Sequence, residues 1–444
     1  MNQEPIETRI QTLGEAKVPS PMLDEKRGEN VHHLFVSDED RIMINIRRTD
    51  ILAMVDQGVD LPSFELAGPR RKVYFDASKL RCAIATCGGL CPGLNDIIRA
   101  IVLELHYRYG VKTIYGVLHG LEGFIPEYNH DFLDLTPARV TSIMNMGGSI
   151  LGSSRGAQDI ERVVDCLEVN NIGMLFMVGG DGTLMAASKI ADTIFERGLK
   201  ISVVGIPKTI DNDIHLVSRS FGFDTAVDVS RMAIQGAHNE ATAYPNGVGL
   251  IKLMGRHSGF IAATAALAQQ DANFVLIPEV DFDLEGPQGL LAALETRVVN
   301  RGHAVIVAAE GAGQKFFEGV DERRDASGNI RLNDIGTFLR DTIKAHFAKK
   351  NIPLNIKYID PSYMIRSLPA NANDSVFCGF LGRDAVHAGM AGKTKLIIGH
   401  WNNHFVHLPM VATAGRRKQV RPNGKLWTTV LESTGQPSLK NDPA

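Results

Sequence analysis

The sequence predicts an α/β protein with two lobes, each a largely parallel sheet flanked by helices, together with an N-terminal arm and a C-terminal tail. Three observations support this fold class. The 444 residues suffice for two or three domains. From Lys79 onward, short apolar runs alternate with amphipathic stretches, and glycine-rich turns follow several of these runs. Strand followed by helix, repeated along a chain, is typical of a parallel sheet.

The elements follow from the spacing of apolar residues. Residues 158–170 are expected to be helical because their apolar side chains recur at intervals of three and four. Residues 287–301 are also expected to be helical, with Pro287 near the first turn, where proline is tolerated. The apolar runs predicted as strands are residues 82–86, 113–118, 174–178, 201–206, 248–254, 274–278 and 304–309.

Composition favours a soluble protein of the cytoplasm. Hydrophobic residues make up 44%, and 47 Lys+Arg against 50 Asp+Glu leave a net charge of -3, which argues against nucleic acid or a membrane as a partner. The N-terminus lacks the apolar segment of a secretory signal, and no apolar run reaches the ~18 residues of a membrane span. Five cysteines suit a reducing compartment. Cys87 and Cys91 could bind a metal, but without a second ligand pair we interpret them as small loop residues.

The first two glycine-rich turns follow predicted strands, where open α/β sheets bind ligands and glycine lets backbone N–H groups approach phosphate. Residues 87–95 (CGGLCPGLN) contain Gly88 and Gly89 and, taken alone, are compatible with a simple tight turn. In residues 179–183 (GGDGT), Asp181 could hold Mg²⁺ and Thr183 could donate from a helix N-terminus. The chain lacks the dinucleotide pattern Gly-x-Gly-x-x-Gly and the Walker ending, so both of those nucleotide-binding classes are poorly supported.

The third turn, residues 207–213 (PKTIDND), concentrates charge in one loop after a predicted strand. Lys208 is a cation, Thr209 a hydroxyl donor, and Asp211 and Asp213 are carboxylates two residues apart. Phosphoryl transfer needs a base for the attacking hydroxyl, positive charge for the moving phosphoryl and a carboxylate that directs a metal. The alternative interpretation is an Asx-rich turn with a capping aspartate.

Together these motifs resemble the 6-phosphofructokinase family from about Lys79 to about Gly392, and particularly its long-chain branch in plants, trypanosomatids and some bacteria. The resemblance implies phosphoryl transfer from ATP to the 1-hydroxyl of fructose 6-phosphate, giving fructose 1,6-bisphosphate and ADP, with Mg²⁺ as cofactor. It also implies an allosteric homotetramer. The motifs that carry it are CGGLCPGLNDIIR, LGSSRG, GGDGT, PKTIDND, KLMGRHSGFIA and AAEG.

The polar composition of the first 75 residues, the basic residues near the C-terminus and the resemblance together predict an order of regions. We expect an N-terminal extension over residues 1–75, followed by a nucleotide-binding lobe over 76–222 that also includes about 365–415. A sugar-phosphate-binding lobe is expected over 223–364. The basic residues after about Gly415 then form a C-terminal tail over 416–444, interpreted as solvated or as docking a partner.

Residue by residue, the resemblance assigns roles in the transfer step. Asp211 matches the catalytic base and Asp213 a carboxylate that supports the metal and the base. Arg155 and Arg256 match cations that stabilise the transferring phosphoryl, although both could instead pair with surface carboxylates. Lys208 can add a third cation, and Thr209 lies beside the base. The residues matched to the nucleotide side are Gly88, Gly89, Arg155, Gly180, Asp181, Gly182 and Thr183, with Asp181 directing the metal.

On the sugar side, Glu310 matches a glutamate that binds sugar hydroxyls, and Lys357 and Arg366 match ligands of the 6-phosphate. Tyr363 stands where shorter bacterial relatives carry histidine. The strand-end residues matched to substrate are Met254, Gly255 and Arg256, beside Thr209 and Asp211.

One position departs from the pattern. Shorter bacterial relatives place an arginine, which reaches the 6-phosphate across a subunit interface, where this chain has Gly247. The missing charge could come from Arg231, from His238 or from the group around Lys357, and the sequence does not choose among them.

The phosphoryl donor is the second open point. Pyrophosphate users of the family usually carry aspartate at the position of Gly182, whereas lysine at the position of Lys208 is common among them. We weight Gly182 more, because it governs whether a nucleotide fits, and expect ATP rather than pyrophosphate. NAD and lipid kinases share GGDGT but lack PKTIDND, and a non-catalytic nucleotide sensor would be expected to lose the base that Asp211 retains.

Overall fold

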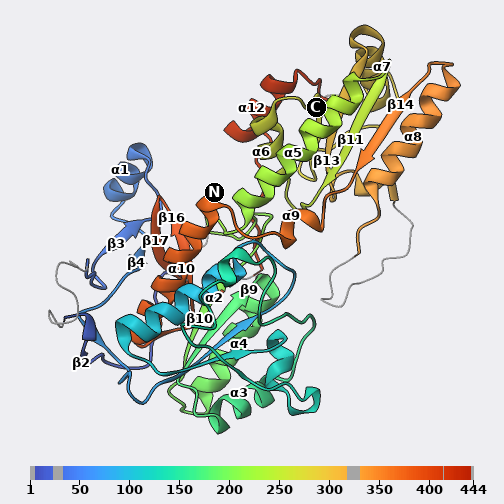
Figure 1. The fold of residues 1–444 in the computed structure, drawn as a ribbon. Helices are drawn as coiled ribbons and strands as arrows, with labels where there is room; N and C mark the ends of the chain where they lie inside the picture. Colours follow the sequence, from blue (N-terminus) through green and yellow to red (C-terminus); the bar gives the residue numbers. More distant parts are fainter. Residues whose placement is uncertain (1–5, 24–33, 318–330, 414, 442–444) are drawn as a thin grey trace. The chain divides into compact units, whose positions relative to one another are not determined.

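The computed structural model describes residues 6–23, 34–317, 331–413 and 415–441. Within it the chain forms two compact units, and Figure 1 labels many of their elements. Residues 1–5 and 24–33 of the predicted extension, and 442–444 of the predicted tail, lie outside the described residues. Unit 1 comprises Met1–Thr209, Ile214–Gly222 and Leu368–Arg417, and unit 2 comprises Ile210–Asp213, Phe223–Ser367 and Lys418–Ala444.

The sheet of unit 1 has a parallel centre with antiparallel strands at both edges. The neighbours β7, β6, β9, β10 and β16 run parallel. Residues of β9 are all buried, as a strand covered on both faces requires, and its sequence is accordingly a continuous apolar run. In spatial order the strands are β3 (Arg41–Met43), β4 (Ser63–Leu66), β17 (His404–Pro409), β16 (Leu396–Trp401), β10 (Ser202–Pro207), β9 (Met174–Gly179), β6 (Arg81–Thr86), β7 (Thr113–Val117) and β8 (Leu133–Asp134).

Part of the predicted N-terminal extension belongs to this sheet. β4 pairs antiparallel with β17, and β3 pairs with β4. Two further segments of the extension form small antiparallel strand pairs. β1 (Gln11–Thr12) pairs with β15 (Lys393–Thr394), and β2 (Val18–Pro19) pairs with β5 (Lys72–Val73). These strands are short and half-polar, which is why their sequence shows no buried-strand pattern.

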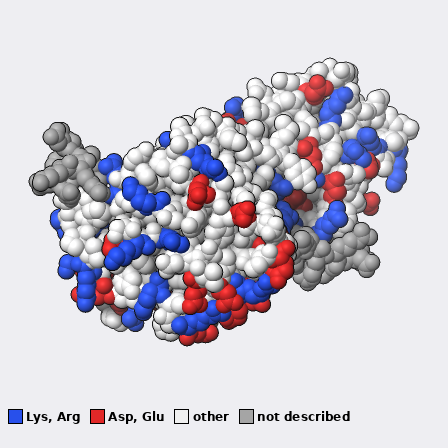
Figure 2. All heavy atoms as spheres, turned by 60° about the horizontal axis from the view of Figure 1, so that its bottom comes forward, with Lys and Arg blue, Asp and Glu red and all other residues white. Residues whose placement is uncertain are grey.

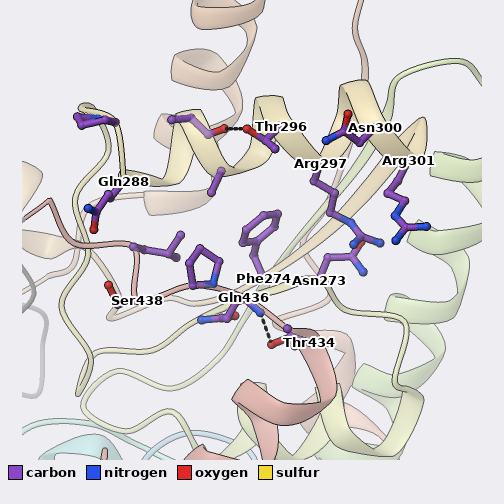
Figure 3. Close-up of a pocket in the computed structure, with 16 residues that line it drawn as sticks. Asn273, Phe274, Gln288, Thr296, Arg297, Asn300, Arg301, Thr434, Gln436 and Ser438 are labelled. Atoms are coloured by element: carbon purple, nitrogen blue, oxygen red, sulfur yellow. Dashed lines mark hydrogen bonds between the residues drawn. The ribbon is translucent and has the colours of Figure 1, made fainter.

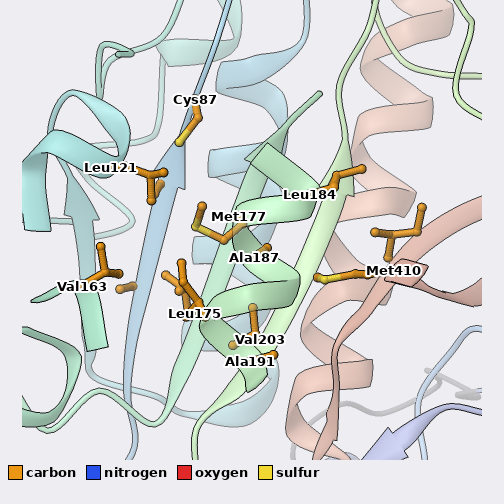
Figure 4. Packing of buried hydrophobic residues seen from close by; sticks show 14 of the residues in the cluster. Cys87, Leu121, Val163, Leu175, Met177, Leu184, Ala187, Ala191, Val203 and Met410 are labelled. Atoms are coloured by element: carbon orange, nitrogen blue, oxygen red, sulfur yellow. The ribbon is translucent and has the colours of Figure 1, made fainter. Parts of the chain in front are cut away.

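Helices cover the sheet and close its core. α4 and α10 both contact β10, while α3 packs on α4 and α2 packs on α10. Figure 4 shows Leu184 and Ala187 of α4 lying over Met177 and Val203 of the sheet, all within one buried cluster. The helices of unit 1 are α1 (Arg48–Asp56), α2 (Leu94–Leu103), α3 (Ile160–Val169), α4 (Asp181–Glu196), α10 (Ala372–Met390) and α11 (Met410–Thr413), and a π-helical turn, η3 (Glu104–Tyr109), extends α2.

Unit 2 is a smaller, wholly parallel sheet with its own core. The strand order is β12 (Phe274–Leu276), β13 (His303–Ala309), β11 (Gly247–Leu253) and β14 (Asn355–Ile359). Both units therefore confirm the predicted α/β class and all seven predicted strands. The helices of unit 2 are α5 (Phe223–Thr242), α6 (Phe260–Gln269), α7 (Leu290–Arg301), α8 (Ile335–Lys349), α9 (Met364–Ser367) and α12 (Lys425–Thr434).

Two predictions of local structure need correction. Pro287 does not lie in the first turn of α7, because Gly289 is the N-cap and a turn at Gly286, with φ of 92°, precedes the helix. The segment predicted as a solvated or partner-docking tail is packed instead: Trp427 and Val430 of α12 are buried, and α12 contacts α6 and β12.

Charges of both signs are mixed on the surface of unit 1 that Figure 2 brings forward. Some of them form ion pairs between helices. Arg197, which ends α4, pairs with Glu161 and, at 2.7 Å, with Asp165 of α3. In the part of the chain that the structure describes, no helix is both long enough and apolar enough to span a bilayer.

Candidate functional site

The first two predicted turns and the start of the third lie together in unit 1. β6, β9 and β10 are parallel neighbours, so their carboxyl ends share one edge of the sheet. The backbone N–H of Lys208 donates to the carbonyl of Gly179 at 2.9 Å, and that of Cys87 donates to Val178 at 2.9 Å. The structure therefore brings together the predicted phosphate-binding turns of this unit.

Lys208 ties the third turn to the first. Its side chain is buried, and its ammonium donates a hydrogen bond to the carbonyl oxygen of Gly89. Gly88 adopts φ of 81°, a conformation that favours glycine, and a Cβ there would lie 3.7 Å from the Lys208 ammonium. The cation predicted from PKTIDND is thus held beside the backbone of the CGGLCPG turn.

The LGSSRG loop lies against the same turn. The backbone N–H of Gly88 donates to the carbonyl of Ser154 at 3.0 Å, and the Ser153 hydroxyl donates to the carbonyl of Gly88 at 2.5 Å. Arg155, the next residue of this loop, has an exposed side chain. Its predicted role toward a phosphoryl group stays a prediction.

The GGDGT turn forms the N-terminus of α4. Gly180 is the N-cap and Asp181 the first helical residue, so this end of α4 carries the positive end of the helix dipole. A Cβ on Gly182 would have no atom within 4 Å, which leaves open space at this position. Thr183 is buried, and its side chain packs against Gly179.

Sequence reasoning missed Arg417, whose guanidinium lies 3.5 Å from the Asp181 carboxylate. The basic cluster after Gly415 was visible in the sequence, but no spacing connects it with GGDGT, which lies more than 200 residues earlier. Asp181 therefore has a cation beside it within unit 1. Cys87 shows no reactive character, because burial raises the pKa of its thiol to about 11.

In unit 2, the ends of the neighbouring strands β11 and β13 bring Arg256 close to Glu310. The backbone N–H of Glu310 donates to Leu253 at 2.8 Å. Gly255 adopts φ of 132° and packs tightly on Ser258, so the MGR turn requires glycine there. Burial raises the pKa of Glu310, and the positive charges of Arg256 and Lys252 partly offset this effect. Met254 also lies in this turn and is half-buried.

The two aspartates of the third turn belong to the same unit. The Ser258 hydroxyl donates to the carbonyl of Asp211 at 3.2 Å, which fixes the PKTIDND loop beside the MGR turn. Asn212, between the aspartates, adopts φ of 54°, and Asp213 is buried. Thr209 belongs to unit 1, where its carbonyl accepts from the Ser220 hydroxyl at 2.8 Å.

The predicted 6-phosphate ligands lie at and after β14. Lys357 is paired in register with Gly249, and its ammonium lies 5.4 Å from the centre of the Tyr244 ring. Arg366 lies in α9, with its guanidinium 4.9 Å from the centre of the exposed Tyr363 ring. Each cation is therefore supported by an aromatic face, an arrangement that leaves hydrogen-bond donors available to an anion.

Lys252 is a further residue that the sequence did not single out. At the end of β11 its ammonium lies 2.8 Å from Asp360 and 3.2 Å from Asp334, the N-cap of α8. It thereby connects β11, α8 and the loop that leads from β14 to Tyr363.

The structure explains why no arginine stands at residue 247. Gly247 begins β11, and a Cβ there would lie 2.0 Å from the backbone oxygen of Ala241 in α5. Any side chain would therefore collide with the helix backbone. The cross-subunit cation of shorter relatives is sterically excluded at this position.

Unit 2 also contains a cavity of about 470 Å³ that is separate from the predicted site residues. Figure 3 shows Arg297 and Arg301 of α7 on one side and the C-terminal residues Thr434, Gln436 and Ser438 on the other. None of the predicted catalytic or binding residues is among those that line it.

Comparison with known families defines the class of this α/β chain. A family model described as Phosphofructokinase matches residues 81–389. This is more than half of the sequence, and the chain belongs to the phosphofructokinase family.

Individual relatives extend the match over nearly the whole chain. Over 448 residues the chain is 49% identical to the ATP-dependent 6-phosphofructokinase of Borreliella burgdorferi, with 99% of each chain covered. It is 44% identical over 423 residues to ATP-dependent 6-phosphofructokinase 7 of Arabidopsis thaliana, covering 95% of this chain and 85% of the relative. The predicted resemblance, including that to plant relatives, is confirmed.

A solved structure shares the fold. The pyrophosphate-dependent phosphofructokinase from Marinobacter aquaeolei matches with a TM-score of 0.66 and 20% identity, covering 82% of this chain and 92% of the other. At 20% sequence identity, this structural similarity supports a shared fold and nothing beyond it.

Proposed function

We propose that this chain is an ATP-dependent 6-phosphofructokinase, which transfers the γ-phosphoryl group of ATP to the 1-hydroxyl of fructose 6-phosphate. The observation that carries the proposal is the 49% identity over 99% of both chains to a protein of that name. The geometry supports it: phosphate-binding turns gather at one sheet edge in unit 1, and carboxylates and cations gather at strand ends in unit 2.

Asp211 is the proposed base. As the sugar's 1-oxygen attacks the γ-phosphorus, the carboxylate takes the hydroxyl proton, the bond from the γ-phosphorus to the β,γ-bridging oxygen breaks, and ADP leaves. The hydrogen bond from Ser258 to the Asp211 carbonyl fixes the backbone that carries this carboxylate. Asp213 supports the base, and Arg256 supplies positive charge for the transferring phosphoryl.

Unit 1 supplies the proposed donor contacts. The α4 N-terminus, together with Lys208 and Arg155, offers backbone N–H groups and cations to the triphosphate. The open space at Gly182 accommodates a nucleotide's α-phosphate without a side chain in the way.

Mg²⁺ is the proposed metal. Among the described residues there is no cluster of three side chains that could hold a metal by itself, but Mg²⁺ usually combines one or two carboxylates with waters and substrate phosphates. Asp181, a carboxylate at a phosphate-binding helix N-terminus, fits that mode of binding. Bound there, Mg²⁺ would neutralise charge on the phosphates.

The proposed sugar contacts lie in unit 2. The half-buried Glu310 carboxylate accepts from the sugar hydroxyls, and Lys357, Arg366 and Tyr363 bind the 6-phosphate. As Gly247 excludes the arginine of shorter relatives, the Lys357 group is the proposed source of that charge. We further propose a cytoplasmic, allosterically regulated homotetramer that takes fructose 6-phosphate and ATP as substrates.

Pyrophosphate as donor is the second candidate, favoured by Lys208 at its position beside Gly89. A side-by-side assay with ATP, pyrophosphate or no donor, each with fructose 6-phosphate and Mg²⁺, tests both. We expect turnover with ATP and a kcat lower by roughly 10²–10⁴-fold in Asp211→Asn, the usual contribution of a positioned base. No ATP-dependent product, or near-normal kcat in the variant, would contradict the proposal.

A further inference from the structure

The C-terminal residues 418–420 form a short segment, here called the clip, that contacts the proposed catalytic loop. We propose that the clip holds residues 211–213 in place and that Lys418 is a positioning residue for Asp213. The proposal rests on the function proposed above. It assigns a role to a basic stretch that sequence reasoning interpreted as a tail.

Backbone pairing joins the clip to the loop. The N–H of Lys418 donates to the carbonyl of Asp213 at 2.7 Å. Arg417, which precedes Lys418, and Ile214, which follows Asp213, form an isolated antiparallel β-bridge. The chain after Gly415 thus runs antiparallel to the end of the PKTIDND loop, as an added strand would.

The rest of the clip binds the turn that carries Arg256. The Gln419 side chain donates to the carbonyl of His257 at 3.3 Å. The N–H of Val420 donates at 2.8 Å to Glu279, a carboxylate that also accepts from the N–H of Gly259 at 2.9 Å. Val420 is also buried. Through hydrogen bonds from three successive residues, the clip therefore connects the loop of the proposed base with the MGR turn.

The Lys418 side chain adds charge to this connection. It is half-buried, lies 5.1 Å from the centre of the Phe260 ring, and interacts electrostatically with Asp213. Burial lowers the pKa of Lys418 to about 8, and the negative charge of Asp213 opposes this effect. A partly desolvated cation beside a buried carboxylate restricts where that carboxylate can lie, because separating the two leaves both charges poorly solvated.

The position of Lys418 near Asp213 suggests how its ammonium would affect the transfer step. Asp213 supports the base two residues away, so a displaced Asp213 disturbs Asp211 as well. Without the ammonium the backbone bond remains, while the side chain of Asp213 loses its electrostatic interaction with Lys418. The loss should therefore fall on kcat rather than on substrate affinity.

The test compares Lys418→Met, which keeps the aliphatic stem, with Lys418→Arg, which keeps the charge. Lys425→Met is the matched control, since Lys425 is an exposed lysine at the start of α12 in the same segment. We expect kcat to fall by about 10–100-fold in Lys418→Met with both KM values within about threefold, partial rescue by arginine, and no change in the control. Thermal unfolding checks that all three variants remain folded.

Hydrogen exchange gives a readout that does not depend on activity. Amides of residues 211–214 should exchange faster in Lys418→Met than in the wild type, with those of β11 unchanged. If the wild type lacked ATP-dependent turnover, the proposed function would fail, while faster exchange would still support the clip. Unchanged hydrogen exchange in Lys418→Met would overturn the positioning role. The same would follow if Lys418→Arg and Lys418→Met lost kcat equally and also lost thermal stability to a matching extent.

Discussion

The ammonium of Lys252 lies 2.8 Å from the Asp360 carboxylate, on the loop between β14, which contains Lys357, and α9, which contains Arg366. Burial works against the charged lysine, but hydrogen bonds to Asp360 and Asp334 outweigh it and raise the pKa of Lys252. The same pairing lowers the pKa of Asp360 despite its partial burial. One side chain at the end of β11 thus fixes the start of the loop that leads to Tyr363.

Replacing Lys252 with methionine should loosen that loop. We expect the KM for fructose 6-phosphate to rise by about 10-fold and unit 2 to lose about 1–3 kcal/mol of stability, because two partly buried carboxylates lose their cation. In a Trp401→Phe background, fluorescence of Trp427 reports unfolding of unit 2. The control Lys344→Met lies on α8 with an exposed side chain. Equal KM values in the two variants would refute the role of Lys252.

The two proposed 6-phosphate ligands give the next prediction. Lys357→Met and Arg366→Met should each raise the KM for fructose 6-phosphate by about 10–100-fold with little effect on that for ATP, since each removes a charged hydrogen bond to phosphate. Initial-rate measurements with either substrate varied will show the difference. If neither variant moved the KM for the sugar, another cation such as Arg231 or His238 would have to supply the charge.

Unit 1 should lose stability in acid because of His407. Burial lowers the pKa of His407 from 6.5 to about 4, although Glu65, which lies 3.3 Å away, opposes the shift. The folded state keeps the ring neutral, whereas the unfolded chain takes up a proton below pH 6.5. This stability is fully present above about pH 6.5 and is lost as the pH falls toward 4, by about 3 kcal/mol in total.

Urea unfolding at pH 7 and pH 5 measures the effect, with Trp401 fluorescence reporting on unit 1 in a Trp427→Phe background. His407→Gln, which keeps a polar group beside Glu65 but does not titrate, should unfold with a smaller difference between the two pH values. Protonation of Glu65 acts in the same direction, because His407 and Lys393 hold its pKa below the usual value in spite of burial. An identical pH dependence in wild type and variant would contradict the assignment.

Seven parallel strands were predictable because most of their residues are buried, so that each is a continuous apolar run. The parallel strands β14 and β16 were not predicted, and every residue of β14 is only half-buried. β9, predicted over residues 174–178, spans Met174–Gly179, and its neighbours agree equally well. The antiparallel strands at the edges of the unit 1 sheet were not predictable. β3 and β4 are short and contain polar residues, and their place in the sheet depends on pairing with β17, more than 300 residues away.

The candidate site divides in the same way. Motifs that are local in sequence identified Asp181, Lys208 and Asp211, because a strand-end loop shows its chemistry in a few consecutive residues. Arg417 and Lys418 escaped because their partners, Asp181 and Asp213, lie more than 200 residues earlier in the chain. The spacing of residues within a basic cluster does not indicate which distant carboxylates it will contact, so these partners are found only in the folded structure.

The donor preference can be tested at Gly182. This residue lies in the first turn of α4, where a Cβ would meet no atom within 4 Å, so Gly182→Asp should fold normally. A carboxylate at the positive end of the helix dipole would even be mildly stabilising in the absence of ligand. Any loss of activity would then report on the ligand rather than on the protein.

With a nucleotide bound, the same carboxylate should repel the α-phosphate. Two like charges about 4 Å apart repel by about 4 kcal/mol at an effective dielectric constant of about 20. We therefore expect wild type to use ATP at least about 10²-fold better than pyrophosphate, measured by kcat/KM, and Gly182→Asp to narrow this gap. Pyrophosphate has no α-phosphate to clash, and Lys208 remains to bind it.

Gly182→Asn separates charge from size, since it adds a side chain of the same shape without the negative charge. If repulsion is the cause, the asparagine variant should keep most of its ATP activity and the aspartate variant should not. Equal losses in the two variants would mean that space at Gly182, rather than charge, selects the nucleotide. A wild-type kcat/KM for pyrophosphate equal to or above that for ATP would instead make Lys208, beside Gly89, the residue that decides the donor.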